Sequence, residues 1–429
     1  MSRYRRRTDS GAEQRATTVE LFYDLVFVFA ITQVSHVLLT HLTWEGVWQA
    51  LLVLLVIWWA WNYTTWLTNE LDPESSVVRL VLIGVMLGTL LLAIAIPDAF
   101  GSRGLLFAGS YVAIQVGRQA FLTFVASAAG TIERQRSAPI LAWFAASGVL
   151  WIAGGIAEGP RTSLWVAALA IDYLAPLALY RIPGRPRLAS DAWQIETAHF
   201  AERFQLFVII ALGESIVLTG ATTAELELGA VRLVALAVAF LATAALWWLY
   251  FNYVARIAER RLELAQDRVR LARDGYTYLH ALIVAGVIVS AVGNELVIAH
   301  PTDTLPGAQV AAVVAGPAIY LLAQVLFRLR LARTVSWRRL GGAVACVAAA
   351  GIGAFAPALL LAGLLLAVLA AVIGSESLAS ARRSARGETS LLERLETEVS
   401  LREPSRAGAR PDSGAPPPSP GRSPPPGGA

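Results

Sequence analysis

The chain has 429 residues, of which 56% are hydrophobic and 15% are charged. Soluble domains carry about 25% charged residues, so this composition excludes a soluble globular protein and indicates a polytopic membrane protein. All 35 basic residues are arginines, which excludes chemistry that needs a lysine Schiff base or a lysine nucleophile. The formal net charge of +4 is explained by arginines in the loops on one side of a membrane, and it gives no reason to expect nucleic acid as a partner.

Apolar runs of about 20 residues, the length that crosses a bilayer, recur along the chain. No small-residue cleavage pattern follows the first run, so we expect a retained first helix rather than a signal peptide. Residues 340–374 are apolar throughout, too long for one helix and short for two, and Gly351, Gly353 and Pro357 favour a hairpin there. The other runs lie near residues 19–40, 46–67, 77–97, 104–126, 138–157, 162–180, 200–221, 230–254, 276–299 and 307–328.

Arginines gather in alternate loops, as expected if those loops face the cytoplasm. The loops assigned to the outside contain little beyond Arg103, Arg161 and Arg232, whereas an acidic inner loop around Glu70 and Asp72 is an exception. If residues 340–374 form two helices, the chain has about twelve transmembrane helices with both termini in the cytoplasm. We therefore expect a multi-pass membrane protein.

Two stretches of the chain, Glu20–Gln33 and Glu202–Glu214, look like copies of one another. With a one-residue gap, Glu20 aligns with Glu202, and Trp58 aligns with Trp247 in the next apolar run. A chance likeness between aromatic helices is the alternative. Because the offset is six helices, both copies would point the same way, which predicts an all-α polytopic membrane protein of two parallel six-helix repeats.

The expected segments follow from these boundaries. They are a basic cytoplasmic N-terminus (1–17), a first membrane half (18–181), a cytoplasmic linker (182–198), a second membrane half (199–375), a cytoplasmic amphipathic segment (376–403) and a disordered tail rich in proline, glycine and arginine (404–429).

Charged residues inside apolar helices are costly and therefore mark candidate sites. At about 100° per residue, His199, Arg203 and Glu214 fall on one stripe of the helix near 200–221, with Glu202 beside it. Glu214 lies near the middle of the bilayer, where a carboxyl group could exchange protons. A neutral Glu214 that hydrogen-bonds a neighbouring helix is the alternative.

Two further candidates lie in other helices of the first half. Asp172 is also expected near mid-depth, and Arg118 is the only arginine well inside an apolar run. Arg118 could neutralise Asp172 or Glu214, or it could extend to the inner membrane surface.

The first helix contributes Glu20 and Asp24 as candidates, although carboxylates also favour the first turns of any helix. A pair between Asp24 and Arg203 would close the cytoplasmic end of the protein. The five histidines show no metal-binding spacing, so no metal is expected. No cofactor or enzyme motif stands in a fitting context. The tryptophan-rich helices could line a cavity, although tryptophan at membrane interfaces is common.

The segments from Thr18 to Gln33 and from His199 to Ser215 resemble the two signature stretches of the bacterial low-temperature-requirement A family. The resemblance covers about residues 17–380 and implies a bacterial inner-membrane protein that is linked by name to growth in the cold. It supplies no substrate and no mechanism. The signature positions that it implies, without roles, are Glu20, Asp24, His199, Glu202, Arg203, Gly213 and Glu214.

These features favour a secondary transporter of an unknown small solute that binds between the halves, with proton coupling through Glu214 or Asp172 as an option. The alternative is a non-transporting membrane factor for cold or envelope stress that acts through membrane lipid or a protein partner. We expect no enzyme, because no nucleophile and base stand together. A water-accessible cavity lined by Glu214, Asp172 and Arg118 would favour transport, whereas solid packing with these residues paired would favour the alternative.

Overall fold

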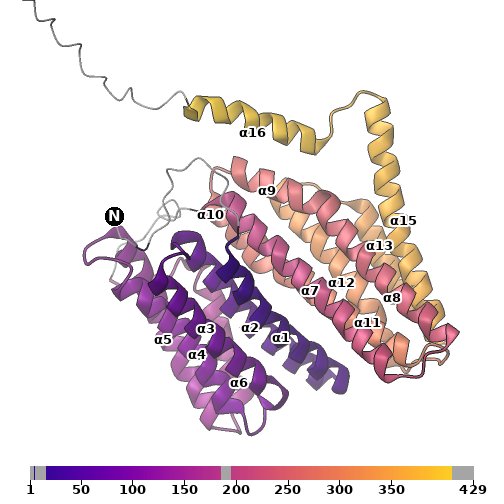
Figure 1. Cartoon of the computed structure of the whole chain (residues 1–429), viewed down its shortest axis with the longest axis horizontal. Coiled ribbons are helices and arrows are strands. Elements are labelled where there is room, and N and C mark those ends of the chain that lie inside the picture. Colours follow the sequence, from indigo (N-terminus) through magenta and orange to yellow (C-terminus); the bar gives the residue numbers. More distant parts are fainter. Residues whose placement is uncertain (1–3, 5–15, 185–194, 408–429) are drawn as a thin grey trace, which may run out of the picture.

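The chain folds into helices joined by short turns. The computed structural model describes Tyr4, residues 16–184 and residues 195–407. The first group of helices comprises α1 (Thr18–Thr40), α2 (Trp44–Glu70), α3 (Ser76–Ala95), α4 (Gly104–Phe124), α5 (Ile132–Ile156) and α6 (Arg161–Leu174). The second group comprises α7 (Thr197–Glu225), α8 (Ala230–Leu249), α9 (Ala255–Leu264), α10 (Arg268–Leu271), α11 (His280–Ala299), α12 (Gly307–Ala332), α13 (Trp337–Ala348), α14 (Ala350–Gly353) and α15 (Ala358–Ala385). Figure 1 shows the two groups side by side, and α16 (Leu391–Ala407) packs against α9.

Nine helical segments within residues 16–184 and 195–407 are long and apolar enough to cross a membrane. This confirms the predicted all-α membrane class. Three of the nine are composite: π-helical turns join α8 to α9 and α10 to α11, and a 3-10 helix (Ile96–Asp98) extends α3. The α4, α6 and α13–α14 segments form where apolar runs were predicted, but they are not among the nine, so the predicted count of twelve is not reached by this measure.

Local chemistry explains where the helix ends differ from the predicted ones. Residues 340–374 lie in two helical segments, α13 with the short α14 and then α15, and Pro357 occupies the N-cap position of α15. The α6 helix ends at Leu174 instead of near residue 180, because Pro176 lacks the N–H that would continue the helix. The α15 helix continues past residue 375 until Gly387, whose positive φ of 69° is typical of a helix stop.

Some predicted segments can be compared with the structure only in part. The expected amphipathic segment, residues 376–403, is divided between the end of α15 and the start of α16. The α16 helix begins at Leu391 and continues to Ala407, so residues 404–407 of the expected disordered tail are helical. Residues 5–15, 185–194 and 408–429 lie outside the described residues, so the expected basic N-terminus, linker and tail stay predictions.

The two groups of helices meet where α1 and α2 pack against α7 and α11. Aromatic rings fill this contact: Trp58 and Trp61 of α2 face Phe204 and Phe207 of α7, with ring centroids 4.3–5.8 Å apart. Trp58 and Trp61 are therefore packed against rings and do not border an open space there. Trp247, which aligns with Trp58, is 46% exposed on α8, so the two aligned tryptophans have different surroundings.

Candidate functional site

The candidate site is the contact between α1 and α7. Three polar contacts join the two helices, and they occur in the same order along both helices. From the N-terminal ends, they join Glu20 to His199, Asp24 to Arg203 and Thr32 to Glu214. The ascending order means that α1 and α7 run parallel, side by side. The predicted stripe on α7 therefore faces α1 rather than lipid.

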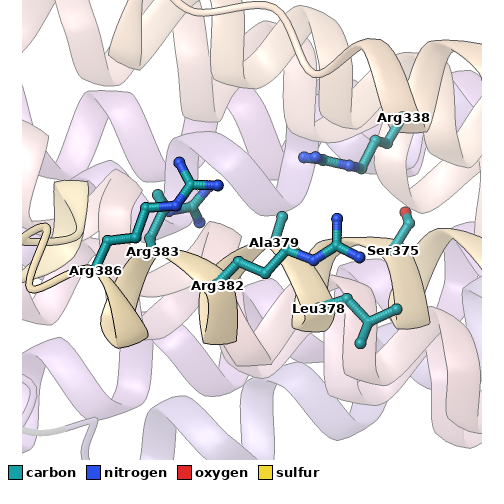
Figure 2. Close-up of a pocket in the computed structure, with 7 residues that line it drawn as sticks. All are labelled: Arg338, Ser375, Leu378, Ala379, Arg382, Arg383 and Arg386. Carbon is teal, nitrogen blue, oxygen red and sulfur yellow. The ribbon is translucent and has the colours of Figure 1, made fainter.

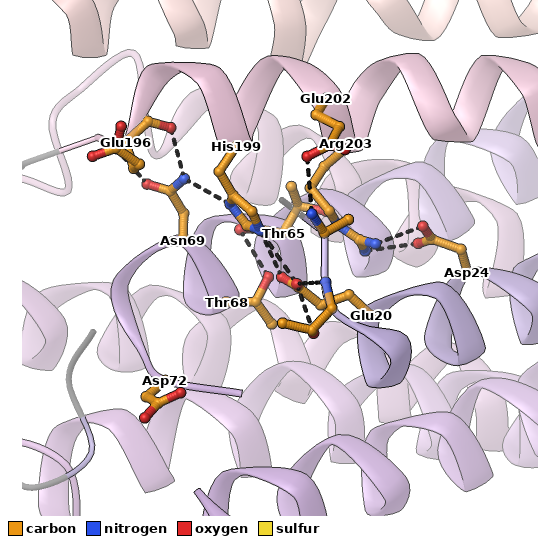
Figure 3. Close-up of polar contacts among 12 residues, drawn as sticks. Glu20, Asp24, Thr65, Thr68, Asn69, Asp72, Glu196, His199, Glu202 and Arg203 are labelled. Carbon is orange, nitrogen blue, oxygen red and sulfur yellow. Dashed lines mark hydrogen bonds and ion pairs between the residues drawn. The ribbon is translucent and has the colours of Figure 1, made fainter. Parts of the chain in front are cut away.

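The Asp24–Arg203 pair lies at the centre of this contact, and Figure 3 shows its two parallel bonds. The Arg203 guanidinium donates to the two Asp24 oxygens at 2.6 and 2.7 Å, and both side chains are fully buried. Trp61 Nε1 donates a third hydrogen bond to Asp24 Oδ1 at 2.8 Å. The ion pair that the sequence suggested is thus present, with geometry typical of strong arginine–carboxylate pairs.

Glu20 and His199 form a second buried contact, one turn nearer the N-terminal ends of α1 and α7. Thr17 and Glu20 form a capping box, in which Glu20 Oε2 accepts from the Thr17 amide and hydroxyl at 2.9 Å. This cap fixes the Glu20 carboxylate at the start of α1. His199 Nε2 lies 3.1 Å from Glu20 Oε1.

Asn69 at the end of α2 sets the orientation of the His199 ring. Its amide donates to the Glu196 carbonyl oxygen at 3.0 Å, and its side-chain oxygen accepts from the Glu196 amide at 2.9 Å. These two bonds fix which side of Asn69 is NH₂, and that NH₂ lies 3.2 Å from His199 Nδ1 (Figure 3). The network therefore assigns Nδ1 as the acceptor and Nε2 as the donor to Glu20.

Glu214 lies deeper between the same helices. Its residue is 2% exposed, and Thr32 Oγ1 donates to Glu214 Oε2 at 2.7 Å. The other carboxylate oxygen is buried without a hydrogen-bond partner among the described residues. Burying a polar atom without a partner is costly. If Glu214 served only to join the helices, both of its oxygens would be expected to have hydrogen-bond partners. Glu202, in contrast, is half-buried near the helix start and accepts from the Ala16 amide at 2.9 Å.

Asp172 and Arg118 lie in the first group of helices, away from Glu214. Asp172 Oδ2 accepts from the Tyr111 hydroxyl at 2.9 Å and from Trp151 Nε1 at 3.1 Å, while Oδ1 is buried without a partner among the described residues. Gln115 donates to the Tyr111 hydroxyl at 3.0 Å and accepts from Arg118. Two side chains therefore separate the Arg118 guanidinium from the Asp172 carboxylate.

Neither of the two alternatives considered for Arg118 is found: it pairs with neither Asp172 nor Glu214, and its side chain is buried inside the protein, 1% exposed, instead of extending to the surface. The Arg118 guanidinium donates to the Ala60 carbonyl oxygen at 3.1 Å and to Thr64 Oγ1 at 3.0 Å, and within the described ranges it forms no ion pair. The reason is geometric: α4 packs against α2, α3 and α5, so α2 supplies uncharged acceptors. A common lining of Glu214, Asp172 and Arg118, which would have favoured transport, is therefore not formed, and an argument for transport has to rest on the α1–α7 contact instead.

Sequence reasoning missed the neutral partners of the charged residues. Trp61, Asn69, Tyr111 and Trp151 each contact a candidate side chain. The one available signal was that these polar groups sit in apolar helices, where a donor without a partner is costly. In the part of the chain that the structure describes, no three histidine, cysteine or carboxylate side chains gather as they would around a metal ion.

Comparison with known proteins agrees with the resemblance of the two signature stretches. Residues 15–374 match the family described as bacterial low temperature requirement A protein (LtrA). The chain belongs to this family. It is also 36% identical over 317 residues to a protein of Rhizobium meliloti (strain 1021) described as uncharacterized protein RA0937, a match that covers 73% of this chain and 77% of that protein. No solved structure matches.

Proposed function

We propose that this member of the low temperature requirement A family is a secondary transporter of a small polar solute, held here in a conformation that is closed at the N-terminal ends of α1 and α7. The observation that carries the proposal is the buried Asp24–Arg203 pair between the two groups of helices. Well-packed apolar residues usually stabilise a protein as much as a buried ion pair does. Stability alone therefore does not explain why an ion pair is buried here. An ion pair whose two charges can separate into water and pair again suits a contact that opens and closes during transport.

We also propose that the two groups are parallel six-helix repeats, so that twelve helices form the membrane part. Two contacts at the helix starts support this, because they are nearly reciprocal. Glu20 of α1 contacts His199 of α7, and Glu202, which aligns with Glu20, accepts from Ala16 just before α1. Reciprocal contacts of this kind are expected around a two-fold axis, and the parallel course of α1 and α7 is consistent with an axis along the membrane normal.

The order of helix neighbours supports the same proposal. In the first group α1 packs on α2 and α3, and α3 to α6 follow each other as neighbours. In the second group α7 packs on α8 and α11, and α11, α12, α13 and α15 follow each other in the same way.

Glu214 is the residue that we assign to proton coupling. It lies between the two groups, beside Thr32, and one of its oxygens has no partner among the described residues. A carboxyl group in such a place can bind a proton in one conformation and release it when the helices separate. The solute would then bind along the α1–α7 contact as it opens.

A second candidate function is supported by the packing between α2 and α7. The rings of Trp58, Trp61, Phe204 and Phe207 fill that contact. A protein that never opens there would act instead as a membrane factor for cold or envelope stress, through lipid or a protein partner.

We further propose an inner-membrane location with both termini in the cytoplasm, because arginines accumulate in the loops at one end of the helices.

The test is solute-driven proton movement in vesicles. Purified full-length protein is reconstituted with a pH-sensitive dye inside, and pools of small solutes are added outside. We expect a solute-dependent pH change with the natural protein and with Glu45→Gln, a control at an exposed carboxylate on α2. Glu214→Gln, which keeps the size and the hydrogen-bonding ability, should abolish the change, and Glu214→Asp should retain part of it.

Full activity of Glu214→Gln at equal reconstitution would show that this residue is only a structural hydrogen-bond partner. The second candidate would be favoured by two results together. No solute pool would cause a pH change or labelled-solute uptake in vesicles, and Glu214→Gln would still rescue a cold-growth defect in a host that shows one.

A further inference from the structure

A basic hollow lies where α13 begins and α15 ends. Its volume is about 400 Å³, and four arginines line it. Arg338 comes from α13, whereas Arg382, Arg383 and Arg386 come from the end of α15. Figure 2 shows these side chains around the hollow, with Leu378 one turn before them on α15. The hollow shares no residue with the α1–α7 contact.

Little negative charge compensates these arginines. The nearest acid along α15, Glu376, is held by Arg339, which donates to both of its oxygens at 2.8 and 2.9 Å. Arg386 has a partly exposed partner, Glu388, at 3.5 Å. The remaining three arginines of the hollow form no ion pair with any residue in the described ranges. Like charges three and four residues apart on a helix repel each other, so a bound anion would stabilise this arrangement.

The hollow also lies at the edge of the membrane-spanning part of the protein. The α15 helix is one of the candidate spans, and its arginines occupy the last turns. Trp337 at the start of α13 is 74% exposed, and Leu378 beside the hollow is 60% exposed. Tryptophan concentrates at the boundary between membrane and water. A hollow at such a boundary would face water on one side and hydrocarbon on the other.

We propose that this hollow binds the phosphate group of an anionic phospholipid, whose acyl chains lie along the exposed apolar side of α15. Arginine pairs with phosphate oxygens through two parallel N–H bonds, and basic pockets at the ends of membrane helices suit anionic headgroups. A soluble phosphate offers the same oxygens but has no chains to contact Leu378. This site does not depend on the transport proposal.

The test measures lipid affinity directly. The full-length protein in neutral detergent is titrated with phosphatidylglycerol, and bound lipid is counted by native mass spectrometry. The test variant combines Arg338→Gln, Arg382→Gln and Arg383→Gln. Each arginine near an anionic lipid surface contributes about fivefold in affinity, so the triple variant should bind on the order of 100-fold more weakly. Arg382→Gln alone, at an exposed side chain without an ion pair in the described ranges, should lose about fivefold and gives a reading if the triple variant folds poorly.

The control variant removes the same charge elsewhere, through Arg79→Gln, Arg181→Gln and Arg394→Gln, which are all exposed. It should bind phosphatidylglycerol like the natural protein, and phosphatidylcholine should bind equally weakly to the natural protein and to all three variants. Equal loss in the control and test variants would overturn the site. Equal affinity for glycerol 3-phosphate and phosphatidylglycerol would overturn the lipid as its occupant.

Discussion

Removing one charge from the Asp24–Arg203 pair should destabilise the protein strongly, and removing both should cost less. Both side chains are fully buried and joined by two bonds of 2.6 and 2.7 Å. A single replacement, Asp24→Asn or Arg203→Met, leaves the other charge buried without compensation, which costs about 3–5 kcal/mol of unfolding free energy. The double variant buries neither charge, and the amide that replaces the Asp24 carboxylate still offers an oxygen to Trp61.

The assay is a double-mutant cycle of the free energy of unfolding in mixed micelles, followed by circular dichroism. We expect the double variant to be more stable than either single variant, which gives a coupling energy of several kcal/mol. The matched control is the Arg256–Glu396 pair, with a similar distance of 2.8 Å but side chains 59% and 38% exposed. Its coupling should be about 0–1 kcal/mol.

The reasoning is refuted if the effects of Asp24→Asn and Arg203→Met simply add, within about 0.5 kcal/mol. That result would mean that water or a rearranged neighbour compensates each charge separately.

Three further predictions test other parts of the fold. Trp61→Phe removes the indole donor to Asp24 and should cost at least about 1.5 kcal/mol of unfolding free energy in the same assay. Gly286→Ala should destabilise by about 1–3 kcal/mol, because its Cβ would lie 2.6 Å from the backbone of α12. Gly213→Ala meets no atom within 4 Å and should be neutral or slightly stabilising; similar losses in both alanine variants would contradict the close approach. A reporter fused after residue 273 should report the cytoplasm, and an external signal would contradict the proposed topology.

The sequence predicted the faces of helices better than their partners. A period of 100° per residue placed His199, Arg203 and Glu214 on one side of α7, and all three contact α1. This worked because the cost of burying charge forces such a stripe toward protein. The partners of Arg118 were predicted wrongly because they are uncharged. Its acceptors are a backbone carbonyl and a hydroxyl on α2, and such uncharged groups occur on every helix and carry no pattern.

The limits of span prediction have a similar origin. Length and apolar content identified the membrane class, but the end of α6 depended on Pro176 and on a tight turn, where Leu179 and Tyr180 take positive φ. Such turns are fixed by packing against neighbouring helices. The Tyr180 hydroxyl, for example, bonds the Tyr63 hydroxyl of α2. A single sequence cannot show that contact, because 117 residues separate the two tyrosines.

The pairing of α1 with α7 also sets a condition on how the protein is made. Asp24 and Arg203 are 179 residues apart, and ribosomes add about 5–20 residues per second. The first helix must therefore wait on the order of 10–40 seconds for its cation to emerge. During that interval a charged Asp24 costs about 2.5–3.5 kcal/mol at the centre of a bilayer and less near its edge. During synthesis, α1 is therefore expected to stay near the membrane surface or within the insertion machinery until α7 has been made.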